Sequence, residues 1–315
     1  MNLTEPLIFE PLFMERVWGG RRLEELFHKP LPPGQPIGES WEIVDREDAQ
    51  SIVRNGSLRG KTLHELWTEH RLDVFGSQAP DASRFPLLFK LLDARERLSV
   101  QVHPPARIAP TLGGEPKTEM WFIVENYDDG DIFAGLRKGV TREDFEQALK
   151  NGSVAEKIHR VPVKAGDAIF IPSGRIHAIG AGNVIVEVQQ NSDTTYRVFD
   201  WNRVGLDGKA RALHIEESMR SIDFDDFEPE LTRQRGNMVV ESDYFHVERV
   251  ELKDSIEAVP KGKFAIFTCL SGAVECGGFH FSPGDFFLLP ATMENREIHS
   301  TKADTTLLRT TIPSP

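Results

Sequence analysis

Short apolar runs with strand-like composition, separated by turns rich in glycine and proline, dominate this sequence of 315 residues. Such a series favours an antiparallel sandwich or barrel over a fold in which strands alternate with helices. Helical spacing of apolar residues marks two patches, residues 61–75 and 141–159. In the second patch, Thr141 and Asp144 are typical of a helix start, and Gly152 divides the patch into two short helices. The strand-like runs lie at residues 85–92, 98–103, 120–124, 168–172, 184–189, 245–250, 264–270 and 286–290.

One short segment occurs twice. Residues 165–173 read AGDAIFIPS, and residues 283–291 read PGDFFLLPA. In both copies Gly-Asp makes a turn, an apolar strand follows, and a proline ends it. A repeat at this separation predicts two related barrel domains. The second copy carries Asn295 where the first carries His177, so we expect a metal site in the first copy to be missing from the second.

The charge balance limits the classes of partner. Thirty-seven basic and forty-nine acidic side chains give a net charge of −12, which argues against nucleic acid or an anionic membrane. A few converging lysines and arginines can still bind a small anion. The sequence shows neither a signal-peptide pattern nor an apolar run of about 18 residues, so we expect a cytoplasmic protein. Cys269 and Cys276 are expected to be reduced thiols.

Candidate metal ligands lie on two predicted strands. In residues 99–104 (SVQVHP), Gln101 and His103 share one face of the strand. For this pair alone, a hydrogen-bonded core histidine is the favoured interpretation. In residues 117–124 (KTEMWFIV), Lys117 and Glu119 share a face with Trp121. This face is either solvated or holds a metal-binding carboxylate and a cation that meets a negatively charged oxygen.

Two further segments bear on the same chemistry. His177 follows a Pro-Ser-Gly turn and is expected to face inward. Two imidazoles, a carboxylate and an amide oxygen together make a plausible shell for a divalent metal. Residues 187–203 carry many hydrogen-bonding groups around Tyr196 and Arg197, as a polyol phosphate site or a surface loop would.

At these residues the sequence resembles the type I phosphomannose isomerase family, especially its short bacterial class. The matching stretches span most of the first two-thirds of the chain in the family's order, whereas the last third matches only as a cupin-like barrel. The stretches are ERVWGG (15–20), GESWEI (38–43), LSVQVHP (98–104), KTEMWFI (117–123), IPSGRIHAIGAG (171–182) and QQNSDTTYRVFDWNR (189–203).

The resemblance implies a mainly β fold of two cupin-like barrels (double-stranded β-helix, or jelly-roll) with a small helical portion. Residues 1–235 would form the catalytic domain and residues 236–315 a degenerate one. One zinc ion per chain would be held by His103, Glu119 and His177, with Gln101 as a fourth ligand. Arg197 and Lys117 stand at positions of catalytic and pocket-lining cations.

The implied reaction is the reversible isomerisation of mannose 6-phosphate and fructose 6-phosphate through an enediol, with the metal as Lewis acid. Candidate substrate-binding residues are Lys117, Arg175 for the phosphate, Glu187 and Tyr196. Either Glu187 or a water at the metal could transfer the proton. Gln101 replaces the first histidine of the usual cupin His-x-His, and Ala181 replaces a usual asparagine. The alternatives are a cupin oxygenase with non-heme iron and a non-catalytic sugar-phosphate-binding protein. We expect a monomer or homodimer.

Overall fold

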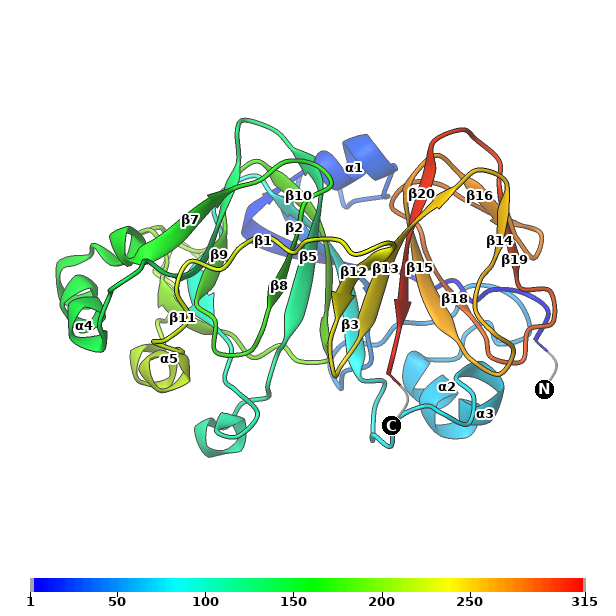
Figure 1. Ribbon diagram of the computed structural model, residues 1–315, viewed down its shortest axis with the longest axis horizontal. Helices are drawn as coiled ribbons and strands as arrows, with labels where there is room; N and C mark the ends of the chain where they lie inside the picture. The colour runs from blue at the N-terminus through cyan, green and yellow to red at the C-terminus, as the bar shows by residue number, and fades with distance from the viewer. Residues whose placement is uncertain (1–2, 314–315) are drawn as a thin grey trace.

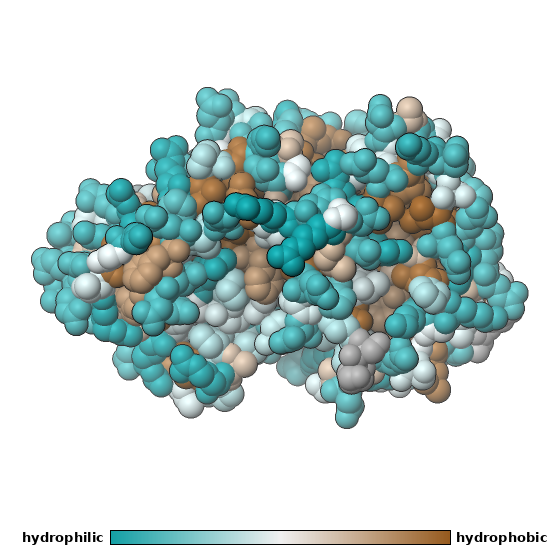
Figure 2. Space-filling view, in the orientation of Figure 1, coloured by the Kyte–Doolittle hydropathy of each residue, from teal (hydrophilic) through white to brown (hydrophobic). Residues whose placement is uncertain are grey.

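The computed structural model describes residues 3–313 and consists mainly of strands, which form two barrels side by side (Figure 1). Strands account for 38% and helices for 14% of the residues, which confirms the predicted mainly β, cupin-type fold. Hydrophilic residues cover most of the face seen in Figure 2. Among the helices of residues 3–313, none is long and apolar enough to cross a membrane.

The first barrel consists of two antiparallel sheets. The six-stranded sheet has the order β1 (Leu12–Gly20), β2 (Ile37–Ile43), β3 (Leu87–Ala94), β10 (Asn183–Gln190), β5 (Glu119–Asn126) and β8 (Ala168–Ile171). The five-stranded sheet has the order β11 (Tyr196–Phe199), β4 (Val100–Val102), β9 (His177–Ile179), β6 (Asp131–Leu136) and β7 (Ile158–Pro162).

The second barrel repeats this topology. Its five-stranded sheet has the order β12 (Met238–Glu241), β13 (His246–Leu252), β20 (Thr305–Thr311), β15 (Ala265–Ser271) and β18 (Phe286–Leu289). Its four-stranded sheet has the order β14 (Ser255–Glu257), β19 (Glu297–Ser300), β16 (Val274–Cys276) and β17 (Phe279–Phe281).

The internal sequence repeat corresponds to equivalent edge strands, β8 and β18, and to the same turn before each. Gly166 and Gly284 have φ angles of +93° and +86°, which favour glycine. In each turn the aspartate after the glycine accepts a hydrogen bond from the backbone N–H three residues earlier: Asp167 from Lys164 and Asp285 from Ser282. The strands of the first two sheets end at residue 199 and those of the last two begin at residue 238. The domain boundary after residue 235 stays a prediction.

Helices occur where the sequence predicts them and in three further places. The first patch contains α2 (Leu63–Glu69) and α3 (Arg71–Val74), and the second contains α4 (Arg142–Asn151) and a 3₁₀ helix (Val154–Lys157). Thr141 and Asp144 form the predicted capping box, and Gly152 ends α4 with a φ of +77°. The helices α1 (Arg22–Phe27) and α5 (Ile215–Ser221) were not predicted, and a 3₁₀ helix (Ala109–Leu112) precedes β5.

The beginning of the chain packs on the second barrel. Leu7 pairs antiparallel with Leu288 of β18, and Ile8 belongs to the apolar core of that barrel. Directly after α3, the ring of Phe75 lies 5.1 Å from that of Phe264. Residues from the first third of the sequence therefore join the two barrels.

Candidate metal centre

Three candidate ligands meet inside the first barrel. His103 follows β4 directly, Glu119 begins β5, and His177 begins β9. Their ligand atoms all lie within 4.8 Å of one another, and all three residues are buried. The two Glu119 oxygens lie 3.4 Å from His103 Nε2 and 3.5 Å from His177 Nε2. The predicted metal-binding triad is therefore brought together.

Hydrogen bonds on the far side of both imidazoles fix their tautomers. His103 Nδ1 lies 2.9 Å from the carbonyl oxygen of Thr194, and His177 Nδ1 lies 2.9 Å from that of Arg175. Because a carbonyl oxygen only accepts, each Nδ1 carries the proton and each Nε2 of a neutral ring presents a lone pair to Glu119. His103 Nε2 and both Glu119 oxygens are buried without a hydrogen-bond partner. Buried polar atoms without partners are costly, and a divalent cation would satisfy all three.

The electrostatics favour the protonation states that a metal needs. Burial and the neighbouring Lys117 lower the pKa of His103 to about 3. Burial also lowers the pKa of His177. Burial alone would raise the pKa of Glu119, but Lys117 and His103 hold it below its usual range. At neutral pH the centre therefore consists of two neutral imidazoles and an ionised carboxylate, as metal binding requires.

Gln101, the predicted fourth ligand, lies beside the triad on β4, where it pairs with His177 of β9. Its amide nitrogen, and not its oxygen, faces His177 Nε2 at 3.2 Å. Coordination by Gln101 would need a rotation of the amide that exchanges its oxygen and nitrogen. Its role as a ligand stays a prediction.

A cavity of about 570 Å³ lies beside this centre. The triad itself does not line the cavity, but Gln101 and Lys117 do, and they contact His177 and Glu119. Gln101, Lys117, Glu187 and Arg197 line it, as a substrate site built on the predicted residues would require. The cavity also contains residues to which the sequence analysis gave no role, among them Arg16, Trp18, Glu39, Lys90, Arg211 and His214.

Lys117 and Arg197, the two cations that were predicted to act on the substrate, both line this cavity. Lys117 is buried, and its Nζ lies 3.4 Å from Glu119 Oε2. Arg197 donates from Nη1 to the carbonyl oxygen of Ala212, whereas its buried Nε has no partner. Among residues 3–313, no carboxylate forms an ion pair with Arg197, and burial and Arg211 lower its pKa. An uncompensated guanidinium in a cavity is suited to bind an anionic oxygen.

Glu187 lies on β10, in the other sheet from Arg197. It belongs to a row of alternating charges that consists of Glu187, Lys90, Glu39 and Arg16. Its Oε2 accepts a hydrogen bond from Trp121 Nε1, and its Oε1 lies 3.1 Å from Lys90 Nζ without a well-directed hydrogen bond. Burial raises the pKa of Glu187, against the effect of Lys90. Burial also acts to raise the pKa of Glu39, but Lys90 and Arg16 lower it to about 2. Two carboxylates with pKa values shifted in opposite directions are typical of acid–base sites.

A sequence signal for Lys90 was present and went unused. Lys90 is the one charged residue in the strand-like run 85–92 (FPLLFKLL), and a buried lysine needs a counter-ion. Arg16, Trp18 and Glu39 lie within the stretches ERVWGG and GESWEI, which carried the resemblance but suggested no chemistry. Nothing in the sequence pointed to His214.

Arg175 and Tyr196 do not line the cavity as the described residues define it. The Arg175 guanidinium forms two hydrogen bonds to Asp226 and one to the carbonyl oxygen of Phe170. Tyr196 is buried in the core and donates its hydroxyl to the carbonyl oxygen of Leu112. Their assignment to the substrate stays a prediction, and their present partners give it no support.

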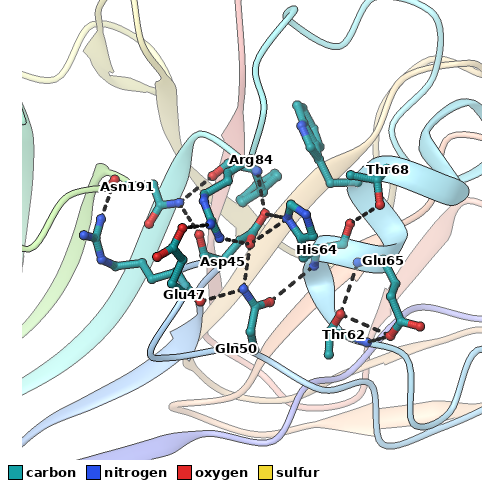
Figure 3. Close-up of polar contacts among 12 residues, drawn as sticks. Asp45, Glu47, Gln50, Thr62, His64, Glu65, Thr68, Arg84 and Asn191 are labelled. Atoms are coloured by element: carbon teal, nitrogen blue, oxygen red, sulfur yellow. Dashed lines mark hydrogen bonds and ion pairs between the residues drawn. The ribbon is translucent and has the colours of Figure 1, made fainter.

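A polar network beside the barrel holds the turn that supplies the Thr194 carbonyl (Figure 3). Asn191 donates from Nδ2 to the carbonyl oxygens of Asp45 (2.6 Å) and Phe85 (2.9 Å). The buried Asp45 carboxylate accepts from Gln50 and from the Phe85 N–H and faces His64. The turn between β10 and β11 is thereby tied to the segments around residues 45 and 85.

Comparison with known proteins places these residues in context. Residues 7–137 match the model for the catalytic domain of type I phosphomannose isomerase. The mannose-6-phosphate isomerase ManA of Bacillus subtilis is 37% identical over 300 residues, which cover 91% of this chain and 93% of the relative. The mannose-6-phosphate isomerase of Streptococcus mutans is 34% identical over 304 residues, which cover 93% and 95%. The crystal structure of mannose 6-phosphate isomerase from Bacillus subtilis superposes with a TM-score of 0.86 at 31% identity, covering 98% of this chain and 100% of that one.

Proposed function

This chain belongs to the type I phosphomannose isomerase family, and we propose that it interconverts mannose 6-phosphate and fructose 6-phosphate with one zinc ion at the His103–Glu119–His177 centre. The observation that carries the proposal is the buried triad with its unpartnered ligand atoms, next to which Lys117 lines a cavity. The reaction is an aldose–ketose isomerisation.

The donor set supports zinc as the cofactor. Two imidazole nitrogens and one carboxylate oxygen are ligands that zinc accepts in catalytic sites, where a fourth position stays open. A zinc ion held there supplies a Lewis acid beside the reacting carbons. The same donors also suit non-heme iron, so the identity of the metal is part of what the experiment below tests.

Lys117 and Glu187 would act on the reacting carbons. Lys117 lies next to Glu119 and can donate a hydrogen bond to the negative charge that develops on O1 or O2. Glu187 is our candidate base because it is buried, lines the cavity and has a raised pKa. The C2 proton moves to its carboxylate and from there to C1, while O2 loses a proton and O1 gains one. Open-chain mannose 6-phosphate thereby becomes fructose 6-phosphate.

The phosphate would lie at the opposite end of the cavity. Arg197 is on β11, one strand further from His177 than Gln101, and Arg211 lines the same region. Arg203 and Arg211 share the carboxylate of Asp200, and Arg203 also pairs with the exposed Glu96 at 3.8 Å. Because Arg197 has no carboxylate partner among residues 3–313, this region has an excess of positive charge that a phosphate would balance. The catalytic role that the resemblance implies for Arg197 stays a prediction, and at this position its guanidinium would act on the substrate by holding the phosphate.

Nuclear magnetic resonance of mannose 6-phosphate incubated with the purified protein tests the proposed reaction. We expect fructose 6-phosphate to accumulate to equilibrium without consumption of oxygen, and elemental analysis to find zinc in the active preparation. Consumption of oxygen by an iron-loaded preparation, without formation of fructose 6-phosphate, would instead identify the cupin oxygenase.

A further inference from the structure

We propose that His214 binds the phosphate group of the substrate through Nε2–H and, through Nδ1, fixes the position of Arg197. The inference rests on the proposed function, because it takes a sugar phosphate as the ligand. His214 lines the cavity, lies outside every stretch that carried the family resemblance, and directly precedes α5.

Its backbone contact defines the tautomer of the His214 ring. The backbone N–H of Arg197 lies 3.2 Å from His214 Nδ1 and can only donate. Nδ1 therefore carries a lone pair, and the proton of the neutral imidazole is on Nε2. Among residues 3–313, no hydrogen bond or ion pair engages this Nε2. The Nε2–H of His214 is therefore a hydrogen-bond donor that can bind a group in the cavity.

The segment that carries His214 follows the Arg197 strand closely. The His214 N–H donates to the carbonyl oxygen of Arg197 at 2.8 Å, and Arg197 Nη1 donates to the carbonyl oxygen of Ala212 at 3.0 Å. With the bond to Nδ1, three contacts join Arg197 to residues 212–214. The position of the guanidinium and that of the His214 ring are therefore coupled.

The charges around His214 select an anion. Asp200 accepts from Arg211 at 2.6 Å on each oxygen and from Arg203 at 2.8 Å, and the exposed Glu96 lies 3.8 Å from Arg203. Arg197 adds a third cation. The carboxylates of Asp193 and Asp207 also line the cavity, but both residues are exposed and form no ion pair with these arginines. A phosphate, with close to two negative charges at neutral pH, balances this excess.

The separation of Arg197 from the metal centre would suit the span of the substrate from C1 and C2 to the phosphate. Neighbouring strands lie about 4.8 Å apart, and His177, Gln101 and Arg197 occupy three adjacent strands, β9, β4 and β11. A hexose phosphate with C1 and C2 at the metal would extend its phosphate across these strands towards Arg197 and the adjoining His214. The Nε2–H of His214 would add a directional hydrogen bond to a site whose other contacts with the phosphate are ionic.

Two substitutions separate the two roles of the ring. In His214→Asn, the amide oxygen lies about where Nδ1 lies and can still accept from Arg197, but no donor reaches the position of Nε2. In His214→Gln, the amide reaches the Nε2 position and loses the contact to Arg197. His280→Asn is the matched control, since His280 is exposed on β17 of the second barrel.

The experiment measures KM, kcat and the Kd of inorganic phosphate for the zinc-loaded wild-type protein and the three variants, with the melting temperature of each. We expect His214→Asn to raise KM and the phosphate Kd by about tenfold, the effect of one hydrogen bond to a charged group, with kcat nearly unchanged. His214→Gln should recover part of the phosphate affinity, and His280→Asn should equal the wild type.

Phosphate affinity unchanged in His214→Asn would overturn the inference, as would an equal loss in His214→Asn and His214→Gln. A fall in kcat alone would place the ring at the reacting carbons and contradict a phosphate contact. If the wild-type protein itself fails to turn over mannose 6-phosphate, the proposed function fails instead, and the phosphate Kd values still test His214 directly.

Discussion

Glu119 is the residue on which the chemistry of this molecule most depends. Its carboxylate is held ionised by Lys117 and lies between two imidazoles, yet neither oxygen receives a well-directed hydrogen bond. Around Glu119 the sequence could predict which residues share a strand face, but not which partner each side chain contacts. The alternation of strand side chains placed Gln101 with His103 and Lys117 with Glu119 on shared faces. That alternation could not show that Arg175 turns to Asp226, because the pairing joins residues 51 positions apart.

At the residue scale, Glu187 should be the group that moves the proton. Glu187→Gln keeps the shape of the side chain and can still accept from Trp121, but it cannot take up a proton at C2. We expect kcat to fall by about 10²- to 10⁴-fold with little change in KM. A coupled assay measures both, and the exposed Glu297→Gln on β19 serves as control. Near-normal turnover would assign the proton transfer to another group.

Asp200 should make stability depend on acid pH. Burial acts to raise the pKa of Asp200, but hydrogen bonds from Arg211 and Arg203 lower it overall. A carboxyl group whose pKa is lower in the folded state contributes stability above its unfolded pKa, near 4, and loses that contribution as pH falls further. The wild type should therefore exceed Asp200→Asn in free energy of unfolding at pH 7, and the difference should shrink below about pH 4. Urea unfolding at several pH values measures it, and a difference independent of pH would contradict the assigned ion pairs.

At the scale of elements, local patterns located eight of the twenty strands in residues 3–313 and missed the other twelve. All eight strand-like runs contain strands, and both helical patches contain helices, because each carries a complete pattern with its own turn or cap. The helices α1 and α5 were missed because neither begins with a side-chain cap, whereas the equally short α2 begins with a capping box formed by Thr62 and Glu65. The cavity wall around Arg211 and His214 follows β11 as an irregular segment, which no periodicity describes.

The turn between β10 and β11 should depend on one side chain. Asn191→Ala removes the donors to the carbonyl oxygens of Asp45 and Phe85 and leaves both acceptors without that partner. We expect a loss of about 1–3 kcal/mol in the free energy of unfolding, the usual cost of an unsatisfied buried polar group. Chemical denaturation measures it against Asn295→Ala, an exposed position in the second barrel. Equal stability of the two variants would show that the network in Figure 3 does not hold the turn.

For the whole molecule, duplication of one barrel has left a chemical difference between the copies. The order of the strands is repeated, but the interior of the second barrel is apolar. Phe267, Phe281 and Phe287 fill it, together with two thiols whose pKa burial raises to about 12. Asn295, which the offset of the sequence repeat pairs with His177, is exposed and precedes β19, whereas His177 is buried and begins β9. The sequence repeat led us to expect no metal site in the second copy, and that stays a prediction. The filling of the interior could not be expected without knowing how the strands pack.

The zinc content should reflect this difference. We expect elemental analysis of the purified, dialysed protein to give one zinc per chain, because the described residues contain one cluster of His, Cys, Asp or Glu that could hold a metal. Both cysteines are buried, and neither belongs to such a cluster. Two zinc ions per chain would contradict a second barrel without a metal site.

The most direct test of the account is isomerase turnover before chelation, after chelation and after readdition of zinc, measured in a coupled assay with mannose 6-phosphate. We expect chelation to abolish turnover in the wild type and zinc to restore it. Glu119→Gln should stay inactive in all three states, because it lacks the ionised carboxylate that completes the triad. Full turnover in a metal-free wild-type preparation, or restoration of Glu119→Gln by zinc, would contradict the claim that this buried triad carries the reaction.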